Sequence, residues 1–122
     1  MSKFVMLVFL IAGALCAKEC SNKSPFPSQE LKSSNHTQRV ASTLDAVLNR
    51  KNGNFTVLEG HSCRNATETL YWYHVILQGE DTRCEVSYTE FVNGQKRGRV
   101  DYLVLESGKT HYEYRWKIAP IK

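Results

Sequence analysis

Only one stretch of this chain has the spacing of an amphipathic helix, and the later segments have the patterns of strands. Apolar residues recur at i, i+4, i+7 and i+8, as Val40, Leu44, Val47 and Leu48. This spacing places the four side chains on one stripe and predicts a helix. Asn35 or Thr37 can cap the start of that helix, and Asn52-Gly53 can end it.

The segments after the helix alternate with a period of two or are continuously apolar. These patterns predict strands at Phe55–Gly60, Leu70–Leu77, Cys84–Thr89, Val100–Leu105 and Tyr112–Ile118. Short turns such as Asn93-Gly94 separate the runs and favour antiparallel hairpins.

Together these patterns predict an α+β fold, in which one long helix packs on a curled antiparallel sheet of about four to five strands. One face of the sheet covers the helix stripe, and water meets the other face. Glu85 alternates with the apolar residues Cys84, Val86 and Tyr88, and we expect its carboxylate and that of Glu90 on the wet face.

Aromatic residues are numerous, and most of them are expected between the sheet and the helix. In Leu70–Leu77, however, apolar side chains occupy both faces, with Leu70 and Trp72 on one and Tyr71 and Tyr73 on the other. One of these two sets could instead be exposed as a patch for a partner.

The N-terminus has the layout of a secretory signal peptide. A charge at Lys3 precedes an apolar run from Phe4 to Ala14. The run is shorter than the ~20 residues that a membrane-spanning helix needs, and the alternative of a buried N-terminal helix is disfavoured because the run has no polar face. We therefore expect cleavage after Ala14 or Ala17 and a secreted, extracellular protein.

The rest of the chain divides into two parts after the expected signal peptide at residues 1–17. Residues 18–34 are polar and contain Pro25 and Pro27, which predicts an extended N-terminal arm. Residues 35–122 are long enough for a single core and predict one domain.

Four N-x-S/T sequons support export and predict a glycoprotein, at Asn22, Asn35, Asn54 and Asn65. Glycans need water, so all four asparagines are expected at the surface. His36 lies inside the second sequon, and we expect it to be exposed as well.

The cysteines predict disulfide bonds, because an exported chain is oxidised. Cleavage after Ala14 leaves Cys16, Cys20, Cys63 and Cys84, whereas cleavage after Ala17 leaves only the last three. Four cysteines allow three pairings, and an odd set leaves one thiol over. A zinc site is disfavoured because the chain has no C-x-x-C pair, so no metal is expected.

No group of residues indicates catalysis. The histidines are scattered along the chain, at His36, His61, His74 and His111. The sequence has no nucleophile elbow, metalloprotease helix or phosphate-binding loop. His74 lies among aromatic residues in a central strand, where a hydrogen-bonded structural histidine is favoured over a base. We expect no enzyme activity and no cofactor.

The formal net charge of +4 is modest. The densest basic cluster contains Lys96, Arg97 and Arg99, between two predicted strands. It could bind a polyanion such as heparin, but a solvated loop is favoured. An exported domain without a recognition motif is not expected to bind nucleic acid, and no membrane partner is expected.

The order of these elements resembles the cystatin family. The helical run Leu44–Leu48, the strand Tyr71–Leu77 and the strand Cys84–Tyr88, which opens with a cysteine, are similar to the helix and the two central strands of that family. The resemblance covers residues 35 to about 105. It implies a cystatin-like fold and a function in binding proteins.

Cystatins inhibit papain-like cysteine proteases with a wedge of three parts: an N-terminal glycine, a Q-x-V-x-G turn and a Pro-Trp turn. In this chain the first hairpin position holds Arg64, Asn65, Ala66, Thr67 and Glu68, and the second holds Phe91, Val92, Asn93 and Gly94. The resemblance assigns partner binding to these nine residues. It also implies that the arm passes the first hairpin, which favours a Cys20–Cys63 bridge over Cys63–Cys84.

Two hypotheses follow for a protein that we expect to be a monomer. The first is a secreted inhibitor of papain-like cysteine proteases. The second is a non-inhibitory cystatin-like domain that binds another extracellular protein, since all three wedge motifs are replaced. A third hypothesis, a small-ligand carrier, is disfavoured because the helix fills the concave side of the sheet.

Overall fold

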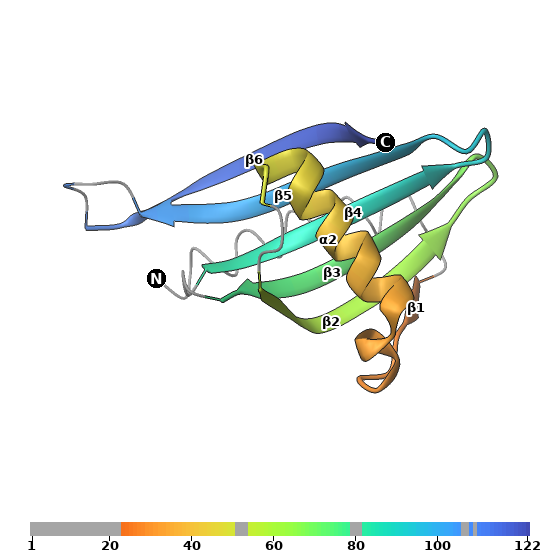
Figure 1. Ribbon diagram of the computed structural model, residues 1–122, viewed down its shortest axis with the longest axis horizontal. Helices are drawn as coiled ribbons and strands as arrows, with labels where there is room; N and C mark the ends of the chain where they lie inside the picture. Colours follow the sequence, from red (N-terminus) through yellow and green to blue (C-terminus); the bar gives the residue numbers. More distant parts are fainter. Residues whose placement is uncertain (1–22, 51–53, 79–81, 106–107, 109) are drawn as a thin grey trace.

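The computed structural model describes residues 23–50, 54–78, 82–105, 108 and 110–122. Its elements follow the order β1 (Lys23–Pro25), the 3₁₀ turn η1 (Glu30–Lys32), α2 (Ser34–Leu48), β2 (Phe55–Arg64), β3 (Glu68–Leu77), β4 (Thr82–Phe91), β5 (Lys96–Leu105) and β6 (Tyr112–Ile121). Figure 1 shows α2 lying obliquely across the strands. The signal peptide expected at residues 1–17 lies outside the described residues.

The strands form one antiparallel sheet in the order β1-β2-β3-β4-β5-β6. The α+β class, with a helix on an antiparallel sheet, is confirmed. The expected number of strands is wrong, because the described residues form six. The additional strand is β1, which comes from the segment expected as an extended arm and pairs with His61–Cys63 of β2.

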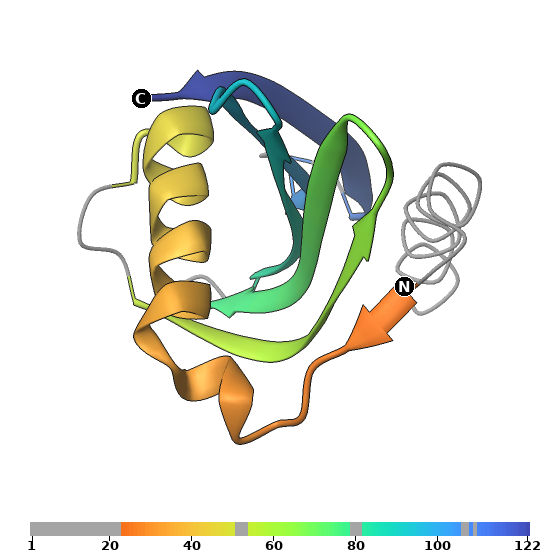
Figure 2. The same cartoon turned by 90° about the vertical axis from the view of Figure 1, so that its right-hand side faces the viewer.

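Helix α2 buries the predicted apolar stripe. Val40 and Leu44 are 0% and 2% exposed, and Val47 and Leu48 pack against the same core. Figure 2 shows the helix crossing the concave side of the sheet, which wraps around it. The helix and one face of the sheet therefore share a single core, as the stripe predicted.

The ends of α2 differ from those expected. Ser33 precedes the first helical residue, in place of Asn35 or Thr37. The helix ends at Asn49, whose φ of 56° is left-handed. Asparagine tolerates this conformation better than most residues, so it can end a helix without glycine. Asn52-Gly53 lies outside the described residues.

An irregularity in β2 accompanies the curvature of the sheet. The register between β2 and β3 shifts between Val57 and Glu59. Leu58, at the shift, is 40% exposed. Such a bulge bends its strand and increases the local twist, which helps the sheet to wrap around α2.

Strand β5 passes very close to α2 at Gly98. A Cβ on Gly98 would lie 2.7 Å from Cγ2 of Thr43 and 3.1 Å from Cδ1 of Ile121. Thr43 is fully buried, and its hydroxyl donates a hydrogen bond of 2.8 Å to the carbonyl of Arg39. This bond fixes the rotamer of Thr43, so its methyl group cannot easily move away.

We predict that Gly98→Ala destabilises the protein by about 1–3 kcal/mol, because the added methyl group overpacks the helix–sheet contact. Urea unfolding measures the change. Thr43→Ser removes the clashing methyl, so the Gly98→Ala change should cost less in a Thr43→Ser background. A Gly98→Ala variant as stable as the wild type would contradict the close contact.

A buried polar cluster holds the start of α2 against the sheet. His36, expected at the surface, is only 4% exposed, so that expectation is wrong. Its Nδ1 lies 2.6 Å from the Tyr73 hydroxyl, and the ring of Phe26 packs on its imidazole with centroids 4.2 Å apart. Burial raises the pKa of the Tyr73 hydroxyl. Successive helical residues point in different directions, so Asn35 of the same sequon is exposed while His36 faces the core.

Candidate functional site

The two turns predicted to bind a partner lie side by side at one end of the sheet. The backbone N–H of Val92 donates a hydrogen bond of 3.0 Å to the carbonyl of Thr67, and Glu68 pairs with Phe91 in the β3–β4 register. This end is at the right of Figure 1. We call it the turn edge, and define it as residues 64–68 and 91–95.

The first turn is fixed by its own asparagine. Oδ1 of Asn65 accepts hydrogen bonds from the backbone N–H of Thr67 at 2.9 Å, the Thr67 hydroxyl at 3.0 Å and the backbone N–H of Glu68 at 3.0 Å. The Asn65 N–H donates to the Glu68 carbonyl at 3.0 Å. A short turn with this many local bonds is rigid for its length.

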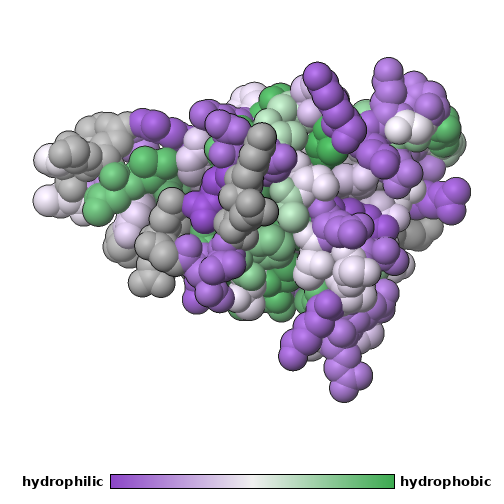
Figure 3. Space-filling view, in the orientation of Figure 1, coloured by the Kyte–Doolittle hydropathy of each residue, from purple (hydrophilic) through white to green (hydrophobic). Residues whose placement is uncertain are grey.

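The second turn presents an apolar side chain at its tip. The Gly94 N–H donates to the carbonyl of Phe91 at 2.9 Å, and Gly94 has a φ of 89°, which favours glycine. Oδ1 of Asn93 accepts a 2.9 Å hydrogen bond from the Gln95 N–H. Val92 is 78% exposed. Figure 3 shows a mostly hydrophilic surface at this end, with a small hydrophobic patch near its tip.

Two further segments reach the same end of the sheet. The arm enters β1 with Lys23 opposite Cys63, the residue before Arg64. The last strand finishes with Ile121 opposite Lys96, directly after the second turn. The structure therefore brings together all nine predicted partner-binding residues. Sequence reasoning missed the end of β6, whose only signal was that the alternation after Tyr112 continues toward the C-terminus.

The structure separates Cys63 from Cys84. Cys63 lies opposite Leu70 and Cys84 opposite Val75, five positions apart along β3. At about 3.3 Å per residue this is roughly 17 Å along the strands, far beyond the reach of a disulfide. Both cysteines are buried. Cys20 lies outside the described residues, so the Cys20–Cys63 bridge stays a prediction.

Three of the predicted glycosylation sites are at the surface. Asn35, Asn54 and Asn65 are exposed, as the sequons require. Asn22 lies outside the described residues. A glycan on Asn65 would stand on the turn edge itself.

The face of the sheet away from α2 carries an unexpected row of polar residues. Consecutive pairings place Glu59, His74, Glu85, Asp101 and Trp116 opposite one another across β2 to β6. We call this row the polar ladder. Glu85 was expected to be solvated, but it is 0% exposed, and Asp101 is only 4% exposed. The expectation for Glu85 is wrong because its neighbours across the sheet, rather than its own strand, decide its burial.

Glu85 is an unusual carboxyl group. Neither of its oxygens has a hydrogen-bond partner within the part of the chain that the structure describes. Burial, followed by the negative charges of Asp101 and Glu59, raises its pKa to about 8, although Arg99 opposes this effect. Glu85 is therefore largely protonated and uncharged at neutral pH.

Asp101, the next member of the ladder, remains well partnered. Nε and Nη2 of Arg99 donate to its carboxylate at 3.0–3.2 Å, and the hydroxyl of Tyr114 donates to it as well. Burial raises the pKa of the Tyr114 hydroxyl to about 12. The hydrogen bond that this hydroxyl donates to Asp101, and the negative charge of Asp101, act in the same direction. The guanidinium of Arg99 also lies 4.6 Å from the ring centroid of Trp116.

His74 lies between Glu59 and Glu85 in the ladder. Its Nδ1 is 3.8 Å from Oε1 of Glu59, and burial lowers its pKa. Within the described ranges, no three His, Cys, Asp or Glu side chains gather in a way that could hold a metal ion.

The basic cluster lies on a strand, so the interpretation as a loop is wrong. Lys96, Arg97 and Arg99 all belong to β5, which begins directly after Gln95, whose carbonyl accepts a hydrogen bond of 2.9 Å from the Phe91 N–H. Alternation places Arg97 and Arg99 on the same face as the polar ladder and Lys96 on the other. The cluster is therefore split between two surfaces.

Comparison with known proteins adds no relative, because no family model, curated protein or solved structure matches this chain. Among the described residues, no helix has the length and apolar character needed to cross a bilayer.

Proposed function

We propose that this chain is a secreted glycoprotein with a cystatin-like fold that binds papain-like cysteine proteases through the turn edge. The single observation that carries the proposal is the direct hydrogen bond between the two turns, from the Val92 N–H to the Thr67 carbonyl. It joins two segments more than twenty residues apart into one protruding edge. The start of β1 at Lys23, opposite Cys63, adds the arm to the same end.

The chemistry of the edge supports insertion into a protease cleft. Both turns are closed by local hydrogen bonds, so the backbone does not offer the extended conformation that a protease cleaves. Val92 supplies an exposed apolar side chain that can be buried on binding. Rigid turns also lose little conformational entropy when they bind.

The alternative function, a non-inhibitory domain that binds another extracellular protein, is favoured by the sequon at Asn65. Its side chain closes the first turn, and a glycan on its free Nδ2 would extend from the turn edge. In that case the exposed Trp116 and Ile118 of β6, 52% and 46% exposed, provide another contact surface.

We predict that Val92→Ser weakens inhibition of papain by about 10- to 100-fold, the loss expected when one apolar side chain is no longer buried. The matched control is Leu105→Ser, because Leu105 is 52% exposed at the opposite end of β5. This control should leave the inhibition constant unchanged.

The assay should use protein without a glycan at residue 65. Wild-type protein made in a bacterial host carries no N-glycan and keeps Asn65, Thr67 and the hydrogen bonds of the turn. Absence of inhibition by this unglycosylated protein at micromolar concentration, for papain and for a cathepsin, would reject the inhibitor hypothesis and leave the alternative. Equal weakening by Val92→Ser and Leu105→Ser would reject the turn edge as the contact.

A further inference from the structure

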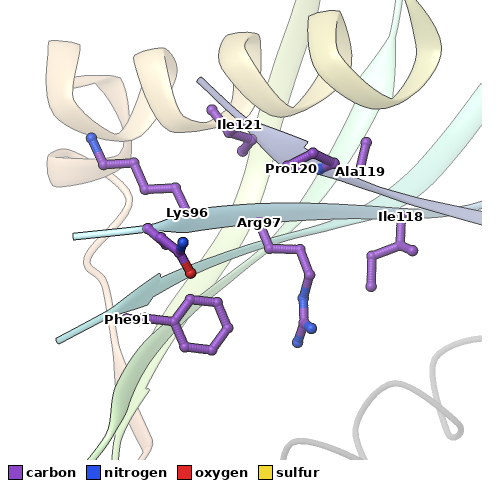
Figure 4. A pocket seen from close by; sticks show the side chains of 8 residues that line it. Phe91, Lys96, Arg97, Ile118, Ala119, Pro120 and Ile121 are labelled. Carbon is purple, nitrogen blue, oxygen red and sulfur yellow. The ribbon is translucent and has the colours of Figure 1, made fainter. Parts of the chain in front are cut away.

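A groove lies beside the second turn, where β4, β5 and β6 end together. It has a volume of about 460 Å³. The residues that line it are Phe91, Gln95, Lys96, Arg97, Ile118, Ala119, Pro120 and Ile121. We call it the terminal groove. In Figure 4, Phe91, Arg97 and Ile118 project to the same side of the strands.

The lining of the terminal groove combines apolar surface with positive charge. Five of its residues are apolar, and its two charged residues are Lys96 and Arg97, both exposed. No Asp or Glu lines it. Lys96 points to the opposite face of the sheet from Arg97 (Figure 4), so a negatively charged group on the Phe91 side meets the Arg97 cation and no like charge from the lining.

Arg97 is held close to the apolar part of the groove. Its guanidinium lies 5.4 Å from the ring centroid of Phe91. Pro120 pairs with Arg97 in the β5–β6 register, and Ile118 pairs with Arg99, so both apolar residues lie on the same stretch of sheet. A ligand with an acidic head joined to an apolar chain can contact Arg97 and these apolar residues together.

We infer that the terminal groove binds an anionic amphiphile, a free fatty acid whose carboxylate contacts Arg97 and whose alkyl chain lies along Phe91, Ile118 and Pro120. Its volume falls in the range of about 300–1,000 Å³ found for small-molecule sites. The carboxylate would accept charge-assisted hydrogen bonds from the guanidinium. This site is separate from the concave side of the sheet, which α2 occupies.

The test uses dodecanoate as the probe and dodecan-1-ol as the matched neutral probe, with binding measured by calorimetry and by methyl NMR. Dodecanoate should bind and shift the methyl signals of Ile118, which lies on the same face as Arg97. Dodecan-1-ol should bind at least about tenfold more weakly, because it lacks the charge that Arg97 recognises.

Two charge reversals separate a specific site from general attraction. Arg97→Glu should weaken dodecanoate binding at least about tenfold, since it replaces the recognising cation by a repelling carboxylate. Arg83→Glu makes the same change of charge at an exposed position on β4, outside the groove, and should have no effect. Circular dichroism checks that both variants remain folded.

The inference does not depend on protease inhibition, so Val92→Ser should leave dodecanoate binding unchanged. Absence of binding at millimolar dodecanoate would overturn it. So would equal binding of the alcohol, or methyl shifts away from the terminal groove. Binding of an acidic, apolar peptide without binding of dodecanoate would also overturn it, and would assign the groove to a protein partner.

Discussion

Replacing Glu85 with Gln is expected to stabilise the protein by about 3 kcal/mol at pH 7 and to have little effect near pH 4. Burial and neighbouring carboxylates raise the pKa of Glu85 from 4.5 to about 8 in the folded protein. At pH 7 the unfolded chain has released this proton while the folded chain still holds it. Folding must therefore take up a proton, and glutamine removes that cost.

The sign of the pH dependence follows from the raised pKa. A carboxyl that binds its proton more tightly when folded stabilises the protein most below its unfolded pKa. Its contribution then falls as the pH rises from 4.5 to about 8, and changes no further above that value. The difference in unfolding free energy between the wild type and Glu85→Gln should grow over that interval.

Urea unfolding of both proteins at pH 4, 7 and 9 measures this difference. Glu113→Gln is the control, because Glu113 has 36% of its side chain exposed on β6 and forms a surface ion pair of 3.6 Å with Arg115, whose loss should cost less than about 1 kcal/mol at both pH 7 and pH 9. A difference between wild type and Glu85→Gln that is the same at all three pH values would contradict the raised pKa. A carbon-13 titration that places Glu85 near 4.5 would do so as well.

Asp101→Asn is expected to destabilise the protein by about 3 kcal/mol at neutral pH. The substitution removes the charge that Arg99 contacts through Nε and Nη2. The Arg99 side chain is only 28% exposed and would remain partly buried without its counterion. Asparagine keeps the shape of the side chain, so the loss reports charge and hydrogen bonding rather than packing.

The same variant has a second readout, because Asp101 lies opposite Glu85. Its negative charge helps to raise the pKa of Glu85, so Asp101→Asn should move that pKa downward. Tyr114→Phe removes one hydrogen bond to Asp101 but keeps the charge pair, and should cost only about 1 kcal/mol. Equal losses from Asp101→Asn and Tyr114→Phe would contradict a dominant Arg99–Asp101 interaction.

Features with a local cause could be predicted well. The helical stripe at Val40 and Leu44 is a periodic pattern, and those residues form the core because a helix can bury only one face against a sheet. The alternation of Cys84, Val86 and Tyr88 placed all three correctly on the buried face of β4. Strand β1 was missed because its three residues include Pro25 and carry no alternation.

Features with a cause elsewhere in the chain could not be predicted. His36 was predicted to be exposed because it lies inside a sequon, but Tyr73 and Phe26 pack against its imidazole ring. The turns were located from the sequence and the resemblance, yet their direct contact depends on the register of β3 and β4. Both cases need the pairing of segments far apart along the chain.

The sequence by itself determined one helix, a following series of antiparallel strands and the face of β4 that meets the helix, because side-chain periodicity is a local property. It did not determine the face of β6, where Trp116 and Ile118 of the alternating set lie away from α2 and are exposed. The tertiary structure alone decided that Glu85 is buried beside Asp101 and that the ends of β4, β5 and β6 form a groove. The physical reason is that burial and charge depend on which strands are neighbours. That arrangement is set by the sheet register, which no single segment encodes.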